Sequence, residues 1–118
     1  MNKAMESRAL GTQVKEALKA SRQCVIEIHS PVGNSAGRRL HKTLSVAGVK
    51  ANLIEVVSKP NIGILIETSQ ECAGIGLAIQ TAFGVAGIEA HLLVQNTRDP
   101  RTVVIHMGSA EKPSKAPK

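Results

Sequence analysis

The sequence repeats itself at an offset of 39 residues, and this repeat constrains the fold more than any other feature. The matched positions share residue type and place within each half: Gly37 with Gly76, the Val-Ala-Gly of 46–48 with that of 85–87, Ala51 with Ala90, and Leu53 with Leu92. Each half has the pattern of a strand, a helix that ends at Val-Ala-Gly, and a second strand. The chain is therefore expected to contain two βαβ units.

Hydrophobic periodicity predicts where the helices and strands lie. Residues 2–20 have apolar positions three and four apart, which is typical of an amphipathic helix. The other expected elements are strands at 24–29, 51–57, 62–67, 88–95 and 102–107, one helix between Ser35 and Gly48, and one helix at 70–86.

The link between the second and third strands decides the predicted topology. Residues 58–61 are too few for a parallel crossover, which needs a dozen residues or more. The third strand is therefore expected to return antiparallel as a hairpin. Two βαβ units joined in this way predict an α+β fold with ferredoxin-like βαββαβ topology. In chain numbering the expected sheet order is 4-1-3-2, with the fifth strand beside the fourth.

The 118 residues, 42% of them apolar, suffice for one domain with one core. Phe83 is the single residue of the Phe, Tyr and Trp set, so the core must be mostly aliphatic. The expected divisions are an N-terminal amphipathic helix in 1–21, a single α/β domain in 22–108 with repeat units at about 24–57 and 62–95, and a disordered basic tail in 109–118.

The formal net charge of +6 invites a nucleic-acid interpretation. Part of this charge belongs to the lysines of the tail, and the compact basic cluster of the body is Arg38, Arg39 and Lys42. Domains of βαββαβ topology that bind RNA on the sheet stack bases on aromatic side chains. Glu27 and Glu67 lie on the corresponding strands of this chain, so base stacking on the sheet is not expected.

Cys24 and Cys72 are far apart in the sequence and form no CxxC motif, so neither a zinc ribbon nor a redox pair is indicated. The expectation is a cytoplasmic protein with reduced thiols. Cys72 lies near a predicted helix start, where a thiol pKa is lowered; the alternative is a small buried apolar residue. Residues 1–21 carry charges throughout, so no signal peptide is expected.

The turn after the first strand is the predicted ligand site. Free N–H groups at a helix start attract anions, and glycines let a ligand approach the backbone closely. Arginines there add charge and bidentate hydrogen bonds for phosphate. The motif is neither a Walker A nor GxGxxG, and the alternative is a capped helix with a solvated basic face. The candidate residues are Gly33, Asn34, Ser35, Gly37, Arg38 and Arg39.

Alternation along the strands predicts a polar face on one side of the sheet. Imidazoles and carboxylates on neighbouring strands suit a metal ion, a pH-responsive surface or a docking partner, and the alternative is a solvated face. No cofactor or metal ion is assigned from the sequence. The candidate residues on this face are Glu27, His29, Glu67, His91 and His106, and Glu55 and Glu89 are also expected there.

The segment from Cys72 to Ala86 is apolar nearly all round, whereas its repeat counterpart carries three cations. A helix without a polar face is buried on more than one side. It is too short to span a bilayer. Either the N-terminal helix covers it or a second copy does, and we expect a homo-oligomer that associates through this helix.

Catalysis has little support in the sequence. Asp99 is the sole aspartate and no HExxH motif occurs. A general acid/base pair of His29 and Glu67 is one alternative, and an ion pair or a solvated face is the simpler interpretation.

The C-terminal strand carries a resemblance to a known group of proteins. Residues 103–108 (Val-Val-Ile-His-Met-Gly), with Lys112 and Pro113, resemble the hydrophobic strand and Val-Gly-x-Lys-Pro ending of a family of uncharacterised bacterial proteins. The chain departs from it by Met107 in place of Val and by three residues inserted before Lys112. In that family the α/β domain follows membrane helices, which are not expected in this chain. The likeness spans about 23–113 and implies a sensor or ligand-binding domain.

These patterns together predict a non-enzymatic ligand-binding, sensor or interaction domain that self-associates. Its expected ligand is a small phosphate-bearing or nucleotide-like anion at the loop of residues 33–39. One alternative is a nucleic-acid-binding protein that uses the basic helix start and the tail. The other is an enzyme or a metal site on the His/Glu face of the sheet.

Overall fold

The computed structural model describes residues 8–19, 24–33, 35–56, 63–95 and 101–108. Each described element lies where the periodicity predicts it, and the tail of 109–118 lies outside the described residues. The elements in chain order are α2 (Arg8–Lys19), β1 (Val25–Pro31), α3 (Ser35–Val46), β2 (Ala51–Val56), β3 (Ile64–Thr68), α4 (Ala73–Val85), β4 (Ala90–Val94) and β5 (Thr102–Met107).

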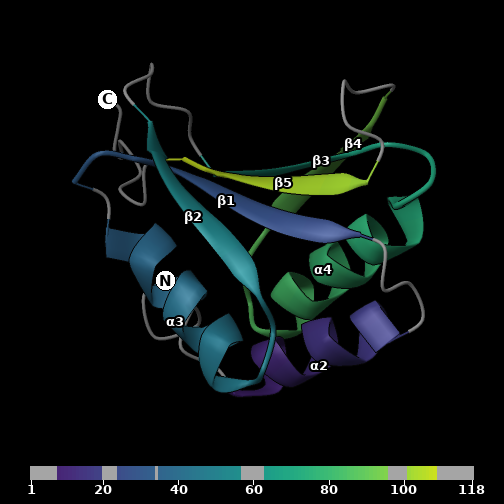
Figure 1. Cartoon of the computed structure of the whole chain (residues 1–118), viewed down its shortest axis with the longest axis horizontal. Helices are drawn as coiled ribbons and strands as arrows, with labels where there is room; N and C mark the ends of the chain where they lie inside the picture. Colours follow the sequence, from purple (N-terminus) through teal and green to yellow (C-terminus); the bar gives the residue numbers. More distant parts are fainter. Residues whose placement is uncertain (1–7, 20–23, 34, 57–62, 96–100, 109–118) are drawn as a thin grey trace.

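In the described part of the chain the strands form a mixed sheet, and the helices α2, α3 and α4 all lie on the same face of it (Figure 1). Alternation produces this arrangement, because every second residue of a strand points to the same side. Ile26, Ile28 and Ile66 are fully buried under the helices, while their neighbours in sequence lie on the opposite, open face. The amphipathic helix α2 packs against α3 and α4 through Leu10 and Val14. The core thus lies between the sheet and the helices.

The α+β class is confirmed, but the strand order differs from the prediction. The sheet order is β2-β1-β5-β3-β4, so β5 lies between the two βαβ units instead of beside β4. In the ferredoxin-like arrangement each unit is split by another strand. Here β1 and β2 are direct parallel neighbours, as are β3 and β4. The third strand does run opposite to the first unit, but it pairs with β5 and forms no hairpin with β2.

Burial explains why β5 takes the central position. Val103, Ile105 and Met107 are buried against the helices, and the strand pairs with β1 on one side and β3 on the other. The edge strands β2 and β4 are more exposed, with three exposed residues each. The most buried strand thus has neighbours on both sides.

The two βαβ units repeat one another in detail. The parallel registers are equivalent, with Ile26 opposite Ala51 in the first unit and Ile64 opposite Ala90 in the second. The side chains of His41 and Gln80, at matched helix positions, each donate a hydrogen bond of 2.9 Å from Nε2 to the carbonyl oxygen of the matched alanine. Positions 39 residues apart in the helices and second strands can therefore be compared one to one.

The glycines that end α3 and α4 explain why both repeat units have the same Val-Ala-Gly sequence at that point. Gly48 and Gly87 have φ values of +90° and +84°, a left-handed backbone conformation that residues with a side chain rarely adopt. The next residues, Val49 and Ile88, donate backbone hydrogen bonds to the carbonyl oxygens of Leu44 and Phe83. Each helix is thereby closed and the chain is directed into its second strand.

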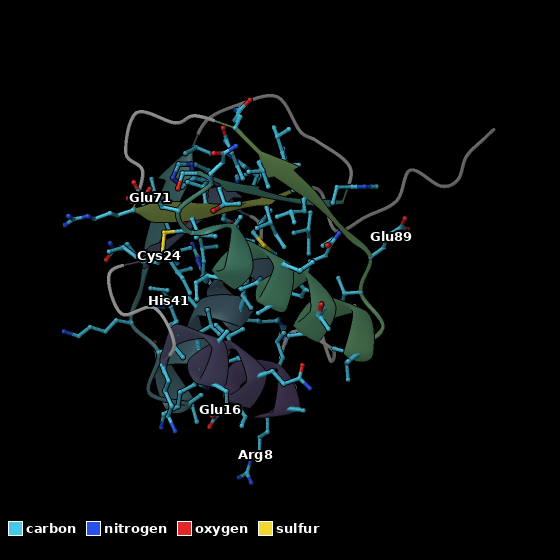
Figure 2. All side chains as sticks on the ribbon, turned by 90° about the vertical axis from the view of Figure 1, so that its right-hand side faces the viewer. Arg8, Glu16, Cys24, His41, Glu71 and Glu89 are labelled. Atoms are coloured by element: carbon cyan, nitrogen blue, oxygen red, sulfur yellow. A yellow bond between two sulfur atoms is a disulfide. The ribbon has the colours of Figure 1, made fainter. Side chains whose placement is uncertain are left out.

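The two cysteines form a disulfide, which corrects the expectation of reduced thiols in unrelated places (Figure 2). Their Cα atoms are 6.0 Å apart although 48 residues separate them in sequence. The strand order explains the proximity, because β1 begins at the end of the sheet where the antiparallel β3 stops. Cys72 does precede α4, and both cysteines are buried. Disulfides are typical of oxidising compartments, so the cytoplasmic location stays a prediction.

The helix α4 is covered by the rest of the chain on two sides. Ile75, Ile79 and Phe83 are buried against the sheet and α2, as one of the two alternatives predicted. Leu77 and Val85 remain exposed. Among the described residues, no helix combines the length and the hydropathy that a bilayer crossing requires.

Candidate functional site

The residues of the predicted anion-binding loop do not converge on one point. Gly33 adopts a φ of +88° in the turn after β1, and Asn34 lies outside the described residues. Ser35 starts α3 at the surface. Gly37 is buried against the side chain of Ser30, where a Cβ atom would collide. Gly37 therefore serves the close packing of α3 on β1.

The two arginines of α3 point to different sides of the helix. Arg38 forms an ion pair with Glu55 of β2, with its Nη2 atom 2.9 Å and its Nε atom 3.2 Å from Oε2. Arg39 instead lines a groove between α2 and α3. Successive helical residues are about 100° apart around the axis, and these two adjacent arginines accordingly have different surroundings.

The groove between α2 and α3 is a cationic cavity in the described part of the chain. It has a volume of about 540 Å³, within the range of ligand pockets. Its lining contains three cations, two hydroxyls, two apolar side chains and no carboxylate: Arg8, Arg39, Lys42, Thr12, Thr43, Val46 and Ala47. Such a lining suits an anion.

A close helix crossing forms this groove. A Cβ atom at Gly11 of α2 would lie 2.9 Å from the Cβ atom of Ala47 and 3.0 Å from the carbonyl oxygen of Thr43, so only glycine fits at this crossing. Sequence analysis identified Arg39 and Lys42 as basic residues but did not connect them with α2. The glycine within an amphipathic helix was the available signal of a close approach.

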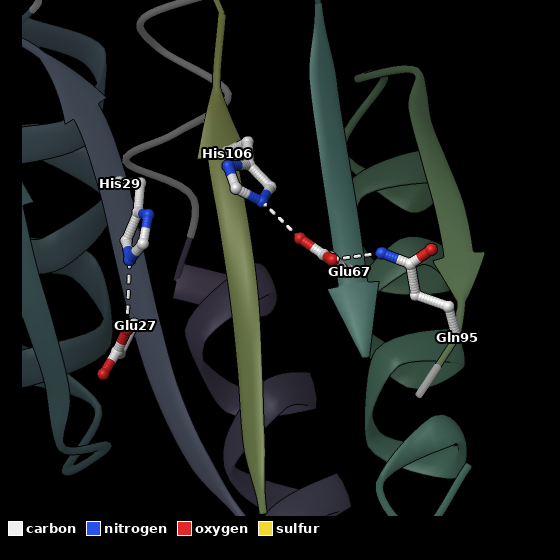
Figure 3. Close-up of polar contacts among 5 residues, drawn as sticks. All are labelled: Glu27, His29, Glu67, Gln95 and His106. Carbon is white, nitrogen blue, oxygen red and sulfur yellow. Dashed lines mark hydrogen bonds and ion pairs between the residues drawn. The ribbon is translucent and has the colours of Figure 1, made fainter. Parts of the chain in front are cut away.

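The His/Glu residues of the open sheet face form a second group (Figure 3). His29 Nε2 lies 3.0 Å from Glu27 Oε1, and His106 Nε2 lies 2.9 Å from Glu67 Oε1. The two imidazole rings meet edge to face with centroids 5.3 Å apart. Gln95 donates a further hydrogen bond to Glu67. These contacts run across β1, β5 and β3 to the end of β4.

The strand order changes the neighbours that the sequence predicted for this face. His106 lies between His29 and Glu67, and His91 is separated from His106 by Leu65 in the register. Glu55 does not belong to this face, because its partner is Arg38 on the helical side. Glu89 precedes β4 and is exposed.

Hydrogen bonding controls the ionisation of Glu67. The hydrogen bond from His106 is the main cause that lowers the pKa of Glu67 below its ordinary value of 4.5, with help from Gln95 and the charge of the histidines; partial burial opposes the shift. A carboxylate whose folded-state pKa is lowered stabilises the fold above its unfolded pKa. This stabilisation is lost as the pH falls through the folded pKa.

We expect Glu67→Gln to be destabilising at neutral pH and progressively less so below about pH 4.5, the ordinary value of this carboxyl. Urea unfolding of both proteins between pH 7 and about pH 3 measures the difference. Glu16→Gln, at an exposed carboxylate of α2, is the control for loss of a charge. A difference between wild type and Glu67→Gln that is constant across this range would contradict the assignment.

The chemistry available to the His/Glu face is limited. Within the described residues, no group of three or more His, Cys, Asp or Glu side chains is arranged to hold a metal ion. The groove between α2 and α3 is lined by none of these residues. The side chains of both imidazole–carboxylate pairs are partly exposed to solvent on this face.

Comparison of the chain with known protein families, with curated proteins and with solved structures finds no match. The resemblance of residues 103–113 to a bacterial family therefore stays a prediction. Function must be inferred from the geometry of the groove and of the sheet.

Proposed function

We propose that this protein is a non-enzymatic binding domain for a small phosphate-bearing anion, and that the ligand occupies the groove between α2 and α3. The observation that carries the proposal is the convergence of Arg8, Arg39 and Lys42 on one cavity of about 540 Å³. The proposal keeps the ligand class expected from the sequence. The proposed site is the groove that Arg39 lines between α2 and α3, instead of the turn at Gly33 that the sequence suggested.

The apolar part of the lining narrows the ligand class. Val46 is 75% exposed and lies beside Ala47 in the same groove as the cations. A ligand pocket typically combines apolar walls with a few polar groups that orient the ligand. A nucleotide-like anion has both parts, because its ring can cover Val46 while its phosphate contacts the cations. The hydroxyls of Thr12 and Thr43 border the same space.

Titration calorimetry with ATP, a cyclic dinucleotide, inorganic phosphate and adenosine tests this proposal. We expect the nucleotides to bind more tightly than phosphate or adenosine alone, and the affinity to fall as salt is added. Replacing Arg39 by Gln removes a charge-assisted hydrogen bond, which contributes about 1.5–3 kcal/mol. The Kd of Arg39→Gln is then expected to rise about tenfold or more.

Arg38→Gln is the matched control, because it removes the neighbouring arginine, which is paired with Glu55 outside the groove. We expect it to change the Kd by less than about twofold, since a change in an exposed ion pair has little effect. Equal weakening by both variants would place the site at the helix start instead. Absence of binding by the wild type to all four probes would refute the proposal. Binding only to oligonucleotides would favour a nucleic-acid-binding protein.

A further inference from the structure

The two edge strands of the sheet, β2 and β4, occupy matched positions in the two repeat units. Their outer surfaces can therefore be compared residue by residue within one molecule. In the first unit the edge is charged: Arg38 of α3 and Glu55 of β2 form an ion pair of 2.9 Å. The positions 39 residues later are Leu77 of α4 and Val94 of β4.

The second unit thus has exposed aliphatic side chains where the first has an ion pair. Leu77 is 53% exposed and Val94 is 40% exposed. Leu93, the next residue on β4, is also 40% exposed, on the open face of the sheet. We call Leu77, Leu93 and Val94 the β4 edge patch. Figure 2 is viewed from this side of the molecule.

The two elements that carry the patch, α4 and β4, contain almost no charge, and the exposed Glu89 precedes β4. The helix α4 contains no Asp, Glu, Lys or Arg, and β4 contains only His91 as a titratable residue. Charged side chains on an edge strand are a common means by which proteins prevent edge-to-edge pairing. The β2 edge has this protection, whereas β4 has none and pairs only with β3 within the described part of the chain.

We propose that the β4 edge patch is the interface with a second copy of this chain, in which the two β4 strands pair antiparallel about a twofold axis. The two sheets then become one continuous sheet. A twofold interface uses the same patch on both subunits. This inference does not depend on anion binding in the groove.

The sequence of β4 is self-complementary in the antiparallel register centred on Leu92. Val94 then lies opposite the small Ala90 of the second copy, and Leu93 lies opposite His91 of the second copy. Side chains directly opposite one another in an antiparallel pair are close enough to pack together. The three residues of the patch are uncharged, so contact between them adds no like-charge repulsion between two copies that each have a net charge of +6.

The protected β2 edge explains why association stops at two copies. In the paired sheet both free ends are β2 strands, each with its Arg38–Glu55 ion pair. If the bound partner had an uncharged edge strand of its own that remained unpaired, further strands could pair with that edge. Of the two described edge strands, only β4 lacks an ion pair, and pairing with a second copy covers β4 in both molecules. This favours a second copy over an unrelated extended peptide as the partner.

Sedimentation and light scattering of the full chain test the interface. We expect the wild type to have twice the chain mass of 12.4 kDa at high concentration. The double variant Leu77→Arg/Val94→Glu transfers the ion pair of the first unit to the second edge, so we expect it to sediment as a monomer. Leu93→Lys is expected to do the same, while Ile54→Lys, at the matched position of β2 and 37% exposed, leaves the dimer intact.

Circular dichroism verifies that each variant is folded. Hydrogen exchange on the unmodified chain provides a second measurement, because dimerisation protects the outward amides of β4 in a concentration-dependent manner and leaves those of β2 unchanged. A wild-type monomer at every concentration would overturn the proposal, as would a dimer that persists in folded Leu93→Lys. If the wild type were monomeric and its β4 amides were protected from exchange only when a peptide was added, the patch would be a binding site for another protein.

Discussion

Reduction of the Cys24–Cys72 disulfide is expected to lower the free energy of unfolding by about 4 kcal/mol. The bond closes a loop of 48 residues, and a cross-link of that span removes conformational entropy chiefly from the unfolded chain. It also connects the first strand of one repeat unit with the helix start of the other. Small domains have a total stability of about 5–15 kcal/mol, so the reduced protein retains only part of it.

Urea unfolding followed by circular dichroism measures this effect, since the chain contains no Trp or Tyr for fluorescence. Both cysteines are buried, so the protein is reduced in the unfolded state and refolded with a dithiol reductant present. The control is the double variant Cys24→Ser/Cys72→Ser, whose unfolding midpoint is expected to be low and independent of the reductant. An unchanged midpoint for wild type, with reduction verified by mass spectrometry, would contradict a stabilising cross-link.

This disulfide also illustrates where inference from the sequence ends. Nothing local to Cys24 or Cys72 indicates the other, and their proximity depends on β5 standing between the two units. Local patterns report how each segment buries its own side chains. They do not report which segments are neighbours, since several strand orders satisfy the same alternation.

The helices and strands themselves were predictable for that reason. The 39-residue repeat and the apolar spacing predicted both βαβ units, and the fifth strand was predicted with its observed ends, Thr102–Met107. The short link before β3 correctly predicted a reversal of direction. It did not predict a hairpin partner, because a strand that reverses can also pair with a strand added later in the chain.

The candidate site was predictable in its residue types and not in its geometry. Arg39 and Lys42 were identified as basic, but the side of α3 that binds a partner helix depends on Gly11 of α2. Two arginines that are adjacent in the sequence suggest one binding site. In a helix, however, their side chains leave the axis in different directions. On the open face, His29 and His106 were both predicted, whereas their edge-to-face contact follows from the observed strand order.

The largest effect of a single substitution is expected at Phe83, where Phe83→Ala should lower the free energy of unfolding by about 3–5 kcal/mol. Phe83 is the largest fully buried side chain among the described residues, and it is the sole Phe, Tyr or Trp residue of the chain. Its repeat counterpart is Leu44, which is also buried. Truncation leaves a cavity that the surrounding aliphatic side chains fill only in part, since their rotamers are fixed by close packing.

Phe83→Leu distinguishes loss of volume from loss of the aromatic ring. It gives the second unit the residue that the first unit already has, so it is expected to cost less than half as much as Phe83→Ala. Val85→Ala, two residues further along α4 and 65% exposed, is the control and should change stability by less than about 0.5 kcal/mol. Urea midpoints of the four proteins decide the matter. If Phe83→Ala and Val85→Ala were equally mild, Phe83 would not be the centre of a packed core, and the close contact of α4 with the sheet and α2 would have to be abandoned.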